Sequence, residues 1–287
     1  MTPSILVLAD LSAATERAAQ YAAALGSPLH AELTLLHFYH DPVLELELAA
    51  VTVAQLDRNQ ADTATALRDV ARRLPVPAGV TLSVAPMPAA VDEAVNRHHP
   101  LLLAMGLSTE HNQLDQVLHN QVLPVLRATH EPLLLVPEAG PAPRIPRRVL
   151  VAADGEPFTP TAAALALAPL LAAWQATFTV AHVKAHHALL ASPGKMAQAD
   201  LAASGLLPPG TALELYEECH VSAGAGVLQA IDDTQADLLV LLARPRTFLE
   251  RRFRRSVTAQ VLRHCRVPVL LVPVDAPELP AWMPTMS

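Results

Sequence analysis

The sequence predicts an α/β fold of two tandem domains, each a five-stranded parallel sheet with helices on both faces. Short apolar runs alternate with alanine-rich segments of helical length, which is the pattern of parallel strands joined by crossover helices. The second half of the chain repeats the order of the first. Aromatic residues make up only 3% of the chain, so the core must consist of Leu, Val and Ala, which suits helices packed on a buried sheet.

The expected elements follow the same order in both halves. The first half predicts strands near 5–9, 33–38, 80–85, 101–106 and 132–136, and helices near 13–25, 52–73, 89–98 and 113–129. The second half predicts strands near 148–153, 177–184, 211–217, 237–243 and 268–272, with helices between them. We therefore expect domains at 1–137 and 148–274, a proline- and glycine-rich linker at 138–147, and a tail at 275–287.

Four pairs of segments carry the repeat, one of which is "LLLAMG" and "LLVLLA". "ILVLADLSAATERAAQYAAAL" is echoed by "RVLVAADGEPFTPTAAALALAPLL", each a buried strand, an Asp, a turn with Ser or Thr, and an alanine-rich helix. "LTLLHFYH" is echoed by "FTVAHVKAH", a second strand that ends in histidine. "VLPVLRATHEPLLLVP" matches "TAQVLRHCRVPVLLVP", with Leu-Arg and a proline before the last strand in both. The two halves are therefore expected to be homologous domains.

Composition restricts the class of protein. The hydrophobic content of 52% is ample for a core, yet the apolar runs are far shorter than a membrane span, and the N-terminus lacks the basic region of a signal peptide. Two cysteines without a CxxC pattern indicate a reducing compartment, so we expect a cytoplasmic protein. The net charge of -7 argues against general affinity for nucleic acid, although residues 1–143 carry -8 and residues 144–287 carry +1.

Open parallel sheets bind ligands beyond the carboxyl ends of their strands, where the strand order reverses. This rule brings one set of residues together in each domain: Asp10, His37 and Gly106, and Asp154, His182 and Ala243. An Asp at such a strand end either contacts a ligand or caps the next helix and fixes the turn. The sequence leaves both roles open.

In these segments the chain resembles the universal stress protein family, in its tandem form. The marks are first strands that end in Asp, second strands that end in Leu-His or Ala-His, and a fourth strand that ends in Met-Gly. The best mark is "SVTAQVLRHCRVPVLLVP", which is similar to the last helix and strand of the family. The resemblance implies a Rossmann-like fold related to adenine nucleotide α-hydrolase domains. It also implies that the last strands of the two domains pair within the chain, and it leaves a homodimer open.

Many members of that family bind ATP with the strand-one Asp and a loop of the form G-x-x-G-x9-G-S/T, because glycines let the backbone approach phosphates. The three glycine positions of the second domain hold Leu242, Pro245 and Arg255. Ser256 keeps the last position of that loop, and Gly106 keeps the first position in the other domain. His119 and Asn120 replace its final pair. The resemblance therefore implies degraded ATP-binding loops, with no certain cofactor and with ATP as the candidate ligand.

Six arginines lie between residues 244 and 255, in the degraded loop and at the start of the next helix. Arg244 and Arg246 could replace the lost amide contacts with guanidinium contacts to an anion. Alternatively, the cluster is a solvated helix face or pairs with acids of the first domain. No recognised nucleic-acid-binding motif accompanies the arginines, so nucleic acid is not an expected partner.

Histidines and nucleophiles give weaker signals. "HFYHD" and "HVKAHH" could hold zinc, but His37 and His182 occupy the strand-two position of the family with or without a metal, so no metal site is predicted. Neither a G-x-S-x-G motif nor a convincing cysteine nucleophile is present in the sequence. Catalysis beyond slow ATP hydrolysis is not expected.

The sequence and the resemblance together predict a non-enzymatic stress-response protein that acts by ligand or protein contacts, with neither nucleic acid nor a membrane as partner. The alternative is an ATP or AMP sensor with one functional crevice and slow ATPase activity. The candidate ligand- or nucleotide-binding residues are Asp10, Ser12, His37, Phe38, Gly106, Asn120, Asp154, His182, Val183, Arg244, Arg246, Ser256 and Val257.

Overall fold

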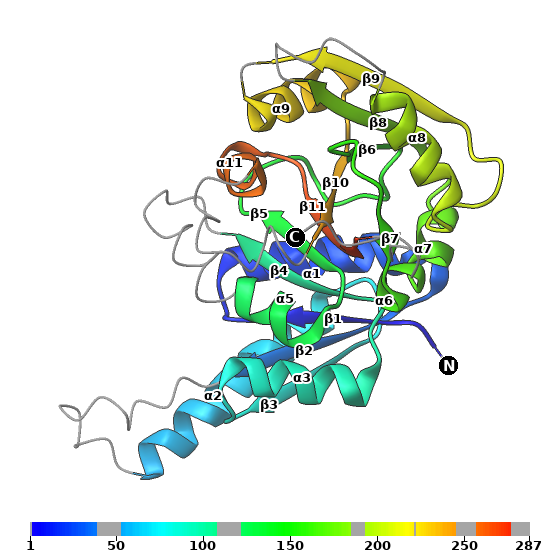
Figure 1. Ribbon diagram of the computed structural model, residues 1–287. Coiled ribbons are helices and arrows are strands. Elements are labelled where there is room, and N and C mark those ends of the chain that lie inside the picture. The colour runs from blue at the N-terminus through cyan, green and yellow to red at the C-terminus, as the bar shows by residue number, and fades with distance from the viewer. Residues whose placement is uncertain are drawn as a thin grey trace, which may run out of the picture.

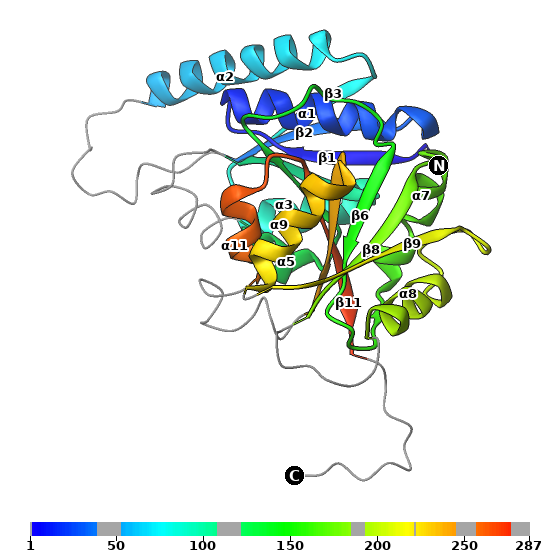
Figure 2. The same cartoon turned by 90° about the horizontal axis from the view of Figure 1, so that it is seen from above.

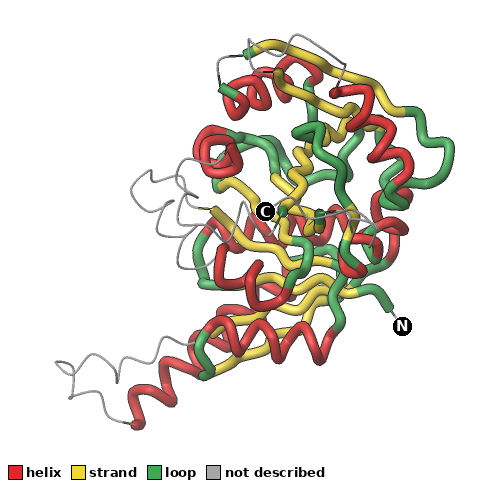
Figure 3. The backbone as a smooth tube through the Cα atoms, viewed as in Figure 1, coloured by secondary structure: helices red, strands yellow, loops and turns green. Residues whose placement is uncertain are grey.

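The computed structural model describes residues 2–38, 53–107, 122–184, 193–220, 222–244 and 257–276. Within them, strands and helices alternate along the chain, and the predicted α/β fold is confirmed (Figures 1 and 3). The strands of the first half are β1 Ser4–Leu8, β2 Glu32–Phe38, β3 Ala78–Ser83, β4 Leu102–Leu107 and β5 Leu133–Pro137. Its helices are α1 Ala13–Gly26, η1 Ser27–Leu29, α2 Val53–Arg73, α3 Met87–His98 and α5 Leu123–Thr129.

The second half follows the same plan. Its strands are β6 Arg148–Ala152, β7 Thr159–Pro160, β8 Thr177–Lys184, β9 Leu213–Cys219, β10 Leu238–Ala243 and β11 Val269–Asp275. Its helices are α6 Ala162–Leu165, α7 Ala168–Ala173, α8 Pro193–Ala203, α9 Ala223–Thr234 and α11 Val257–His264. None of the helices in the described ranges is long and apolar enough to cross a bilayer.

The described strands form one 11-stranded sheet, in the order β3-β2-β1-β4-β5-β11-β10-β6-β8-β9, with β7 added beside β11. Apart from the short β7, the strands within each half are parallel, but β5 and β11 are antiparallel, with Leu134 opposite Leu270. The last strands of the two halves thus join the sheets. Because β5 and β11 run in opposite directions, the strands of the first half and those of the second half point in opposite directions. Their carboxyl ends therefore lie on opposite sides of the sheet, measured along the strands.

The two faces of the sheet carry separate cores. Alternate residues of each strand point to opposite faces, so Leu134 and Leu270 belong to one buried cluster and Leu135 and Leu271 to the other. Buried residues of α1, α2, α7 and α8 join the first cluster. Those of α3, α5, α9 and α11 join the second, and α9 and α11 lie side by side (Figure 2).

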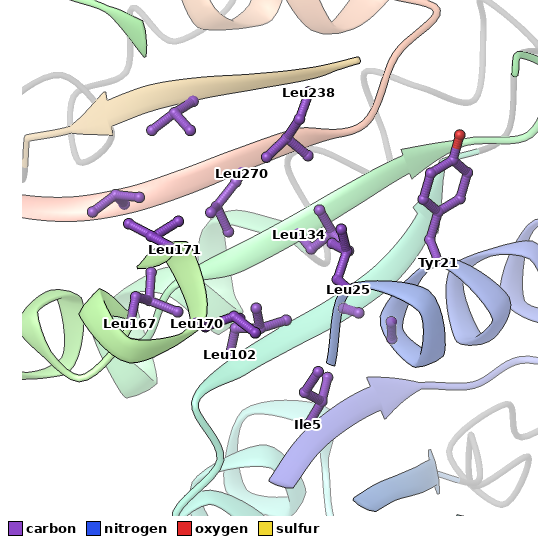
Figure 4. Packing of buried hydrophobic residues seen from close by; sticks show 14 of the residues in the cluster. Ile5, Tyr21, Leu25, Leu102, Leu134, Leu167, Leu170, Leu171, Leu238 and Leu270 are labelled. Carbon is purple, nitrogen blue, oxygen red and sulfur yellow. The ribbon is translucent and has the colours of Figure 1, made fainter. Parts of the chain in front are cut away.

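The first cluster is continuous across both halves. Leu170 and Leu171 of α7 lie among Leu25, Leu102 and Leu134 of the first half (Figure 4). The buried indole Nε1 of Trp174 donates a hydrogen bond of 2.9 Å to the Leu25 carbonyl. The halves therefore share a core as well as a sheet.

The segment between the halves is attached at both ends. Arg17 Nε donates to the Pro137 carbonyl at 2.9 Å, and the Tyr21 hydroxyl donates to the Pro141 carbonyl at 2.7 Å. At the other end, Asp237 accepts hydrogen bonds from the backbone N–H groups of Arg147 and Arg148, at 2.8 and 3.1 Å, and pairs with Arg144. Burial alone would raise the pKa of Asp237, but these donors outweigh it and lower the pKa.

The chain after β6 departs from the expected single alanine-rich helix. It first forms β7, which pairs antiparallel with β11, and then two short helices, α6 and α7. The Thr161 hydroxyl caps α6 by accepting from the Ala164 N–H at 3.2 Å. Pro169 has no N–H to bond to the Leu165 carbonyl, so α6 ends at Leu165.

Candidate functional site

Two equivalent groups of residues lie at the carboxyl ends of the strands, one in each half. We call them the first strand-end site (Asp10, Ser12, Thr15, His37 and Gly106) and the second strand-end site (Asp154, Gly155, His182 and Arg244). They lie beside β1 and β4, and beside β6 and β10, where the strand order of each half reverses.

Both sites share one hydrogen bond from the second strand. His37 Nδ1 lies 2.6 Å from the Ala9 carbonyl, and His182 Nδ1 lies 3.0 Å from the Ala153 carbonyl. A carbonyl only accepts, so each Nδ1 carries the hydrogen. These histidines fix the strand end just before the Asp. In the described ranges, no three His, Cys, Asp or Glu residues are placed to hold a metal ion.

In the first site, Asp10 closes the turn into α1. Its Oδ1 accepts from the Ser12 N–H at 3.0 Å and from the Thr15 hydroxyl at 2.6 Å, while Ser12 Oγ caps α1 by accepting from the Thr15 N–H at 3.1 Å. Burial would raise the pKa of Asp10, but the hydrogen bonds from Ser12 and Thr15 outweigh burial and hold the pKa below its ordinary value. Of the two roles left open for Asp10, the turn-fixing role is therefore present.

Thr15 was not among the predicted site residues, although it is buried and holds Asp10. The signal was in the sequence: Thr15 follows Ser12 by three residues, which is the spacing at which a cap residue meets the backbone of the first helical turn.

Gly106 has a packing role in the structure. A Cβ built on it would lie 2.4 Å from the carbonyl carbon and oxygen of Ala14, so only glycine lets α1 approach β4 this closely. The equivalent residue of β10 is Leu242, whose side chain is packed against the first core cluster. A leucine there is incompatible with such a close helix, and the second half has β7 after its first strand instead.

The turn after the first strand also differs. Leu11 has a φ of 63° and is 45% exposed, whereas the equivalent Gly155 has a φ of 82°. A left-handed conformation is unfavourable for leucine and free of this cost for glycine. A Cβ on Gly155 would also lie 2.9 Å from Pro193 Cβ and 3.1 Å from His182 Cε1, so α8 begins directly against this turn.

In the second site, Arg244 donates hydrogen bonds to three groups among the described residues of its own half. Its Nη2 donates to Asp154 Oδ1 at 3.0 Å and to the Glu156 carbonyl at 2.7 Å, and its Nη1 donates to the Pro157 carbonyl at 3.0 Å. The side chain of Arg244 is 12% exposed and that of Asp154 is 55% exposed. We call these four residues the Arg244 clamp. The sequence predicted that this guanidinium could contact an anion. In the structure it donates hydrogen bonds to the turn after β6.

The remaining candidates have other surroundings or lie outside the described ranges. Val183 packs against α9, since a Cβ on Gly226 would meet its Cγ1 at 2.6 Å. Phe38 ends β2 opposite Ser83, and the exposed Val257 begins α11. Asn120, Arg246 and Ser256, together with most of the arginine cluster, lie outside the described residues.

The fold and the two sites define a tandem α/β protein with one strand-end site per repeat. The family model "Universal stress protein family" matches residues 1–137 and again residues 146–273. The chain therefore belongs to the universal stress protein family, in tandem form.

Solved structures agree in fold. A universal stress protein from Archaeoglobus fulgidus DSM 4304 superposes with a TM-score of 0.68 at 17% identity, over 95% of this chain and 96% of that chain. A functionally unknown protein from Pseudomonas aeruginosa PAO1 gives a TM-score of 0.53 at 16% identity, over 94% of this chain and 92% of that chain. No curated protein matches the chain in sequence.

Proposed function

We propose that this tandem universal stress protein acts in the cytoplasm as a non-enzymatic stress-response protein, through contacts with proteins or small ligands, and that it binds ATP weakly or not at all. The observation that carries the proposal is the Arg244 clamp. Among the described residues of the second strand-end site, the guanidinium of Arg244 is already bonded to the carboxylate of Asp154 and to two carbonyls of the turn. A phosphate would have to displace these bonds before it could use the same guanidinium.

The first strand-end site supports the same proposal. Gly106, the surviving glycine of the family loop, lies against Ala14, where it serves helix packing. The carboxylate of Asp10 accepts from its own turn. Residues at or beside the positions with which many relatives bind ATP thus have structural roles in both halves of this chain.

The proposal is tested by calorimetric titration of nucleotide-stripped protein with Mg-ATP, with AMP in parallel. We expect no saturable heat at micromolar nucleotide. Saturable binding at one site per chain would contradict the proposal and favour the sensor.

One observation favours that second candidate, a nucleotide sensor that uses the first strand-end site. The hydrogen bonds to Asp10 come from neutral donors, Ser12 and Thr15, whereas Asp154 pairs with a guanidinium. Asp10 therefore keeps a carboxylate for a ribose hydroxyl, with the exposed Leu11 beside it. If titration detects binding, Asp10→Asn should weaken it and the matched Asp154→Asn should not. The opposite result would place the ligand in the second half.

A further inference from the structure

The two outer edges of the sheet differ in charge. The order of the described strands places β3 at one end and β9 at the other. Strand β9 carries Glu214, Glu217 and Glu218, and such charges protect an edge strand from pairing with another chain. Strand β3 has no such protection, because no charged residue occurs between residues 74 and 91.

The last strands of the two halves, β5 and β11, show how this chain uses uncharged strand segments. Residues 133–135 of β5 and 269–271 of β11 are all leucine or valine, and they pair with each other. If the two halves formed separate sheets, their outer strands would be β3 and β5 in the first half and β11 and β9 in the second. Of these four, β9 is acidic, and β5 and β11 pair with each other. Apart from the two-residue strand β7, β3 is the only strand in the described part of the chain that is both uncharged and paired on one side alone.

The free backbone groups of β3 can be assigned. The Leu33 N–H donates to the Pro77 carbonyl at 2.9 Å, so Pro77 faces β2. Alternation along the strand then points the N–H and C=O groups of Ala78, Val80 and Leu82 outward. Just beyond the strand, Val84 is 74% exposed, which extends the uncharged edge.

We propose that β3 pairs antiparallel with β3 of a second copy of this chain, about a two-fold axis near Val80. In this register Ala78 of each copy lies opposite Leu82 of the other, and the outward N–H and C=O groups satisfy one another. An uncharged strand pairs with itself without charge repulsion, whereas β9 would bring its glutamates against each other. Pairing of β3 with β9 of the next copy would leave further edges open and form fibres, whereas the two-fold pairing closes as a dimer.

The test is the oligomeric state of the full chain, measured by size-exclusion chromatography with light scattering over a range of concentrations. We expect the wild type to show twice the chain mass of 30.6 kDa. Val80→Pro removes an outward N–H that no bond within the sheet uses, so it should give a monomer with an unchanged circular dichroism spectrum.

The matched control is Leu215→Pro. Val80 pairs with Leu35 and Leu215 with Val180, so the two residues hold equivalent places on the two outer strands. His220 N–H donates inward to the Lys184 carbonyl at 3.1 Å, and alternation makes the Leu215 N–H an outward group too. The Leu215→Pro protein should remain a dimer.

Thr81→Lys is a second variant that does not alter the backbone, and it decides the matter if Val80→Pro fails to fold. A lysine on the edge strand should also give a monomer. In hydrogen exchange, the amides of Ala78, Val80 and Leu82 should be protected in the wild type and exchange fast in Thr81→Lys. A wild type that stays monomeric at its highest attainable concentration overturns the proposal. The proposal is also overturned if the Thr81→Lys protein remains a dimer. The same holds if Leu215→Pro dissociates the dimer as well.

Discussion

The two strand-end sites begin with the same plan and complete it with different chemistry. In each, a histidine from the second strand bonds to the carbonyl before the Asp. In the first site a hydroxyl and a backbone N–H then hold the Asp. In the second, the Arg244 guanidinium holds it and also binds two carbonyls of the turn.

One residue difference explains much of this divergence. Gly106 lets α1 lie directly on β4 after a short turn. With Leu242 at the same place, the second half follows a longer path through Glu156 and Pro157 to β7. The carbonyls of that path are the ones that Arg244 binds. The difference between glycine and leucine at this position therefore accompanies a different course of the backbone.

The largest expected effect comes from making the first site resemble the second. Gly106→Ala puts a methyl group 2.4 Å from the Ala14 backbone and should lower the free energy of unfolding by about 3 kcal/mol, because α1 must move away from β4. The control is Gly79→Ala, where the nearest atom to the new Cβ is 4.0 Å away and little change is expected. Urea denaturation measures both. Equal effects would show that close helix packing does not distinguish the two sites.

The second prediction removes the Arg244 clamp. Arg244→Met should cost about 2 kcal/mol, because a largely buried guanidinium leaves one carboxylate and two carbonyls without their donor. Asp154→Asn should cost less than half as much, since Asp154 is exposed and Arg244 keeps both carbonyls. Denaturation of the two variants and of the double variant measures the difference. Equal losses would mean that the ion pair is the main interaction of the clamp, in place of the carbonyl bonds.

The sequence predicted the fold well and the contents of the sites only in part. Apolar runs and the internal repeat locate nearly all strands, because alternation of strand and helix is a local pattern. The partner of Arg244 is 90 residues away, and its choice of Asp154 over a ligand depends on the path of the chain between them. Likewise, the sequence shows that Gly106 is a glycine but not that Ala14 lies against it. Long-range packing decides such roles.

A smaller effect tests the hydrogen bonds of Asp10 through pH. Its pKa in the folded protein lies below the ordinary value of 3.8, so its ionised form stabilises the fold above that value. This contribution is lost as the pH falls through the lowered pKa. Asp10→Asn should therefore cost about 1 kcal/mol at neutral pH and much less in acid. Thermal unfolding at several pH values measures the difference, and a cost that does not change with pH would contradict the assigned role.

The smallest expected effect concerns the turn itself. Leu11→Gly should raise the free energy of unfolding by about 0.5 kcal/mol, because relief of the left-handed leucine slightly exceeds the entropy cost of glycine. The reciprocal Gly155→Ala should destabilise, since its φ is 82° and Pro193 lies 2.9 Å from the new Cβ. Urea denaturation resolves the signs. If Leu11→Gly destabilises instead, the exposed leucine contributes packing that outweighs its backbone strain, and the first turn is built around that side chain.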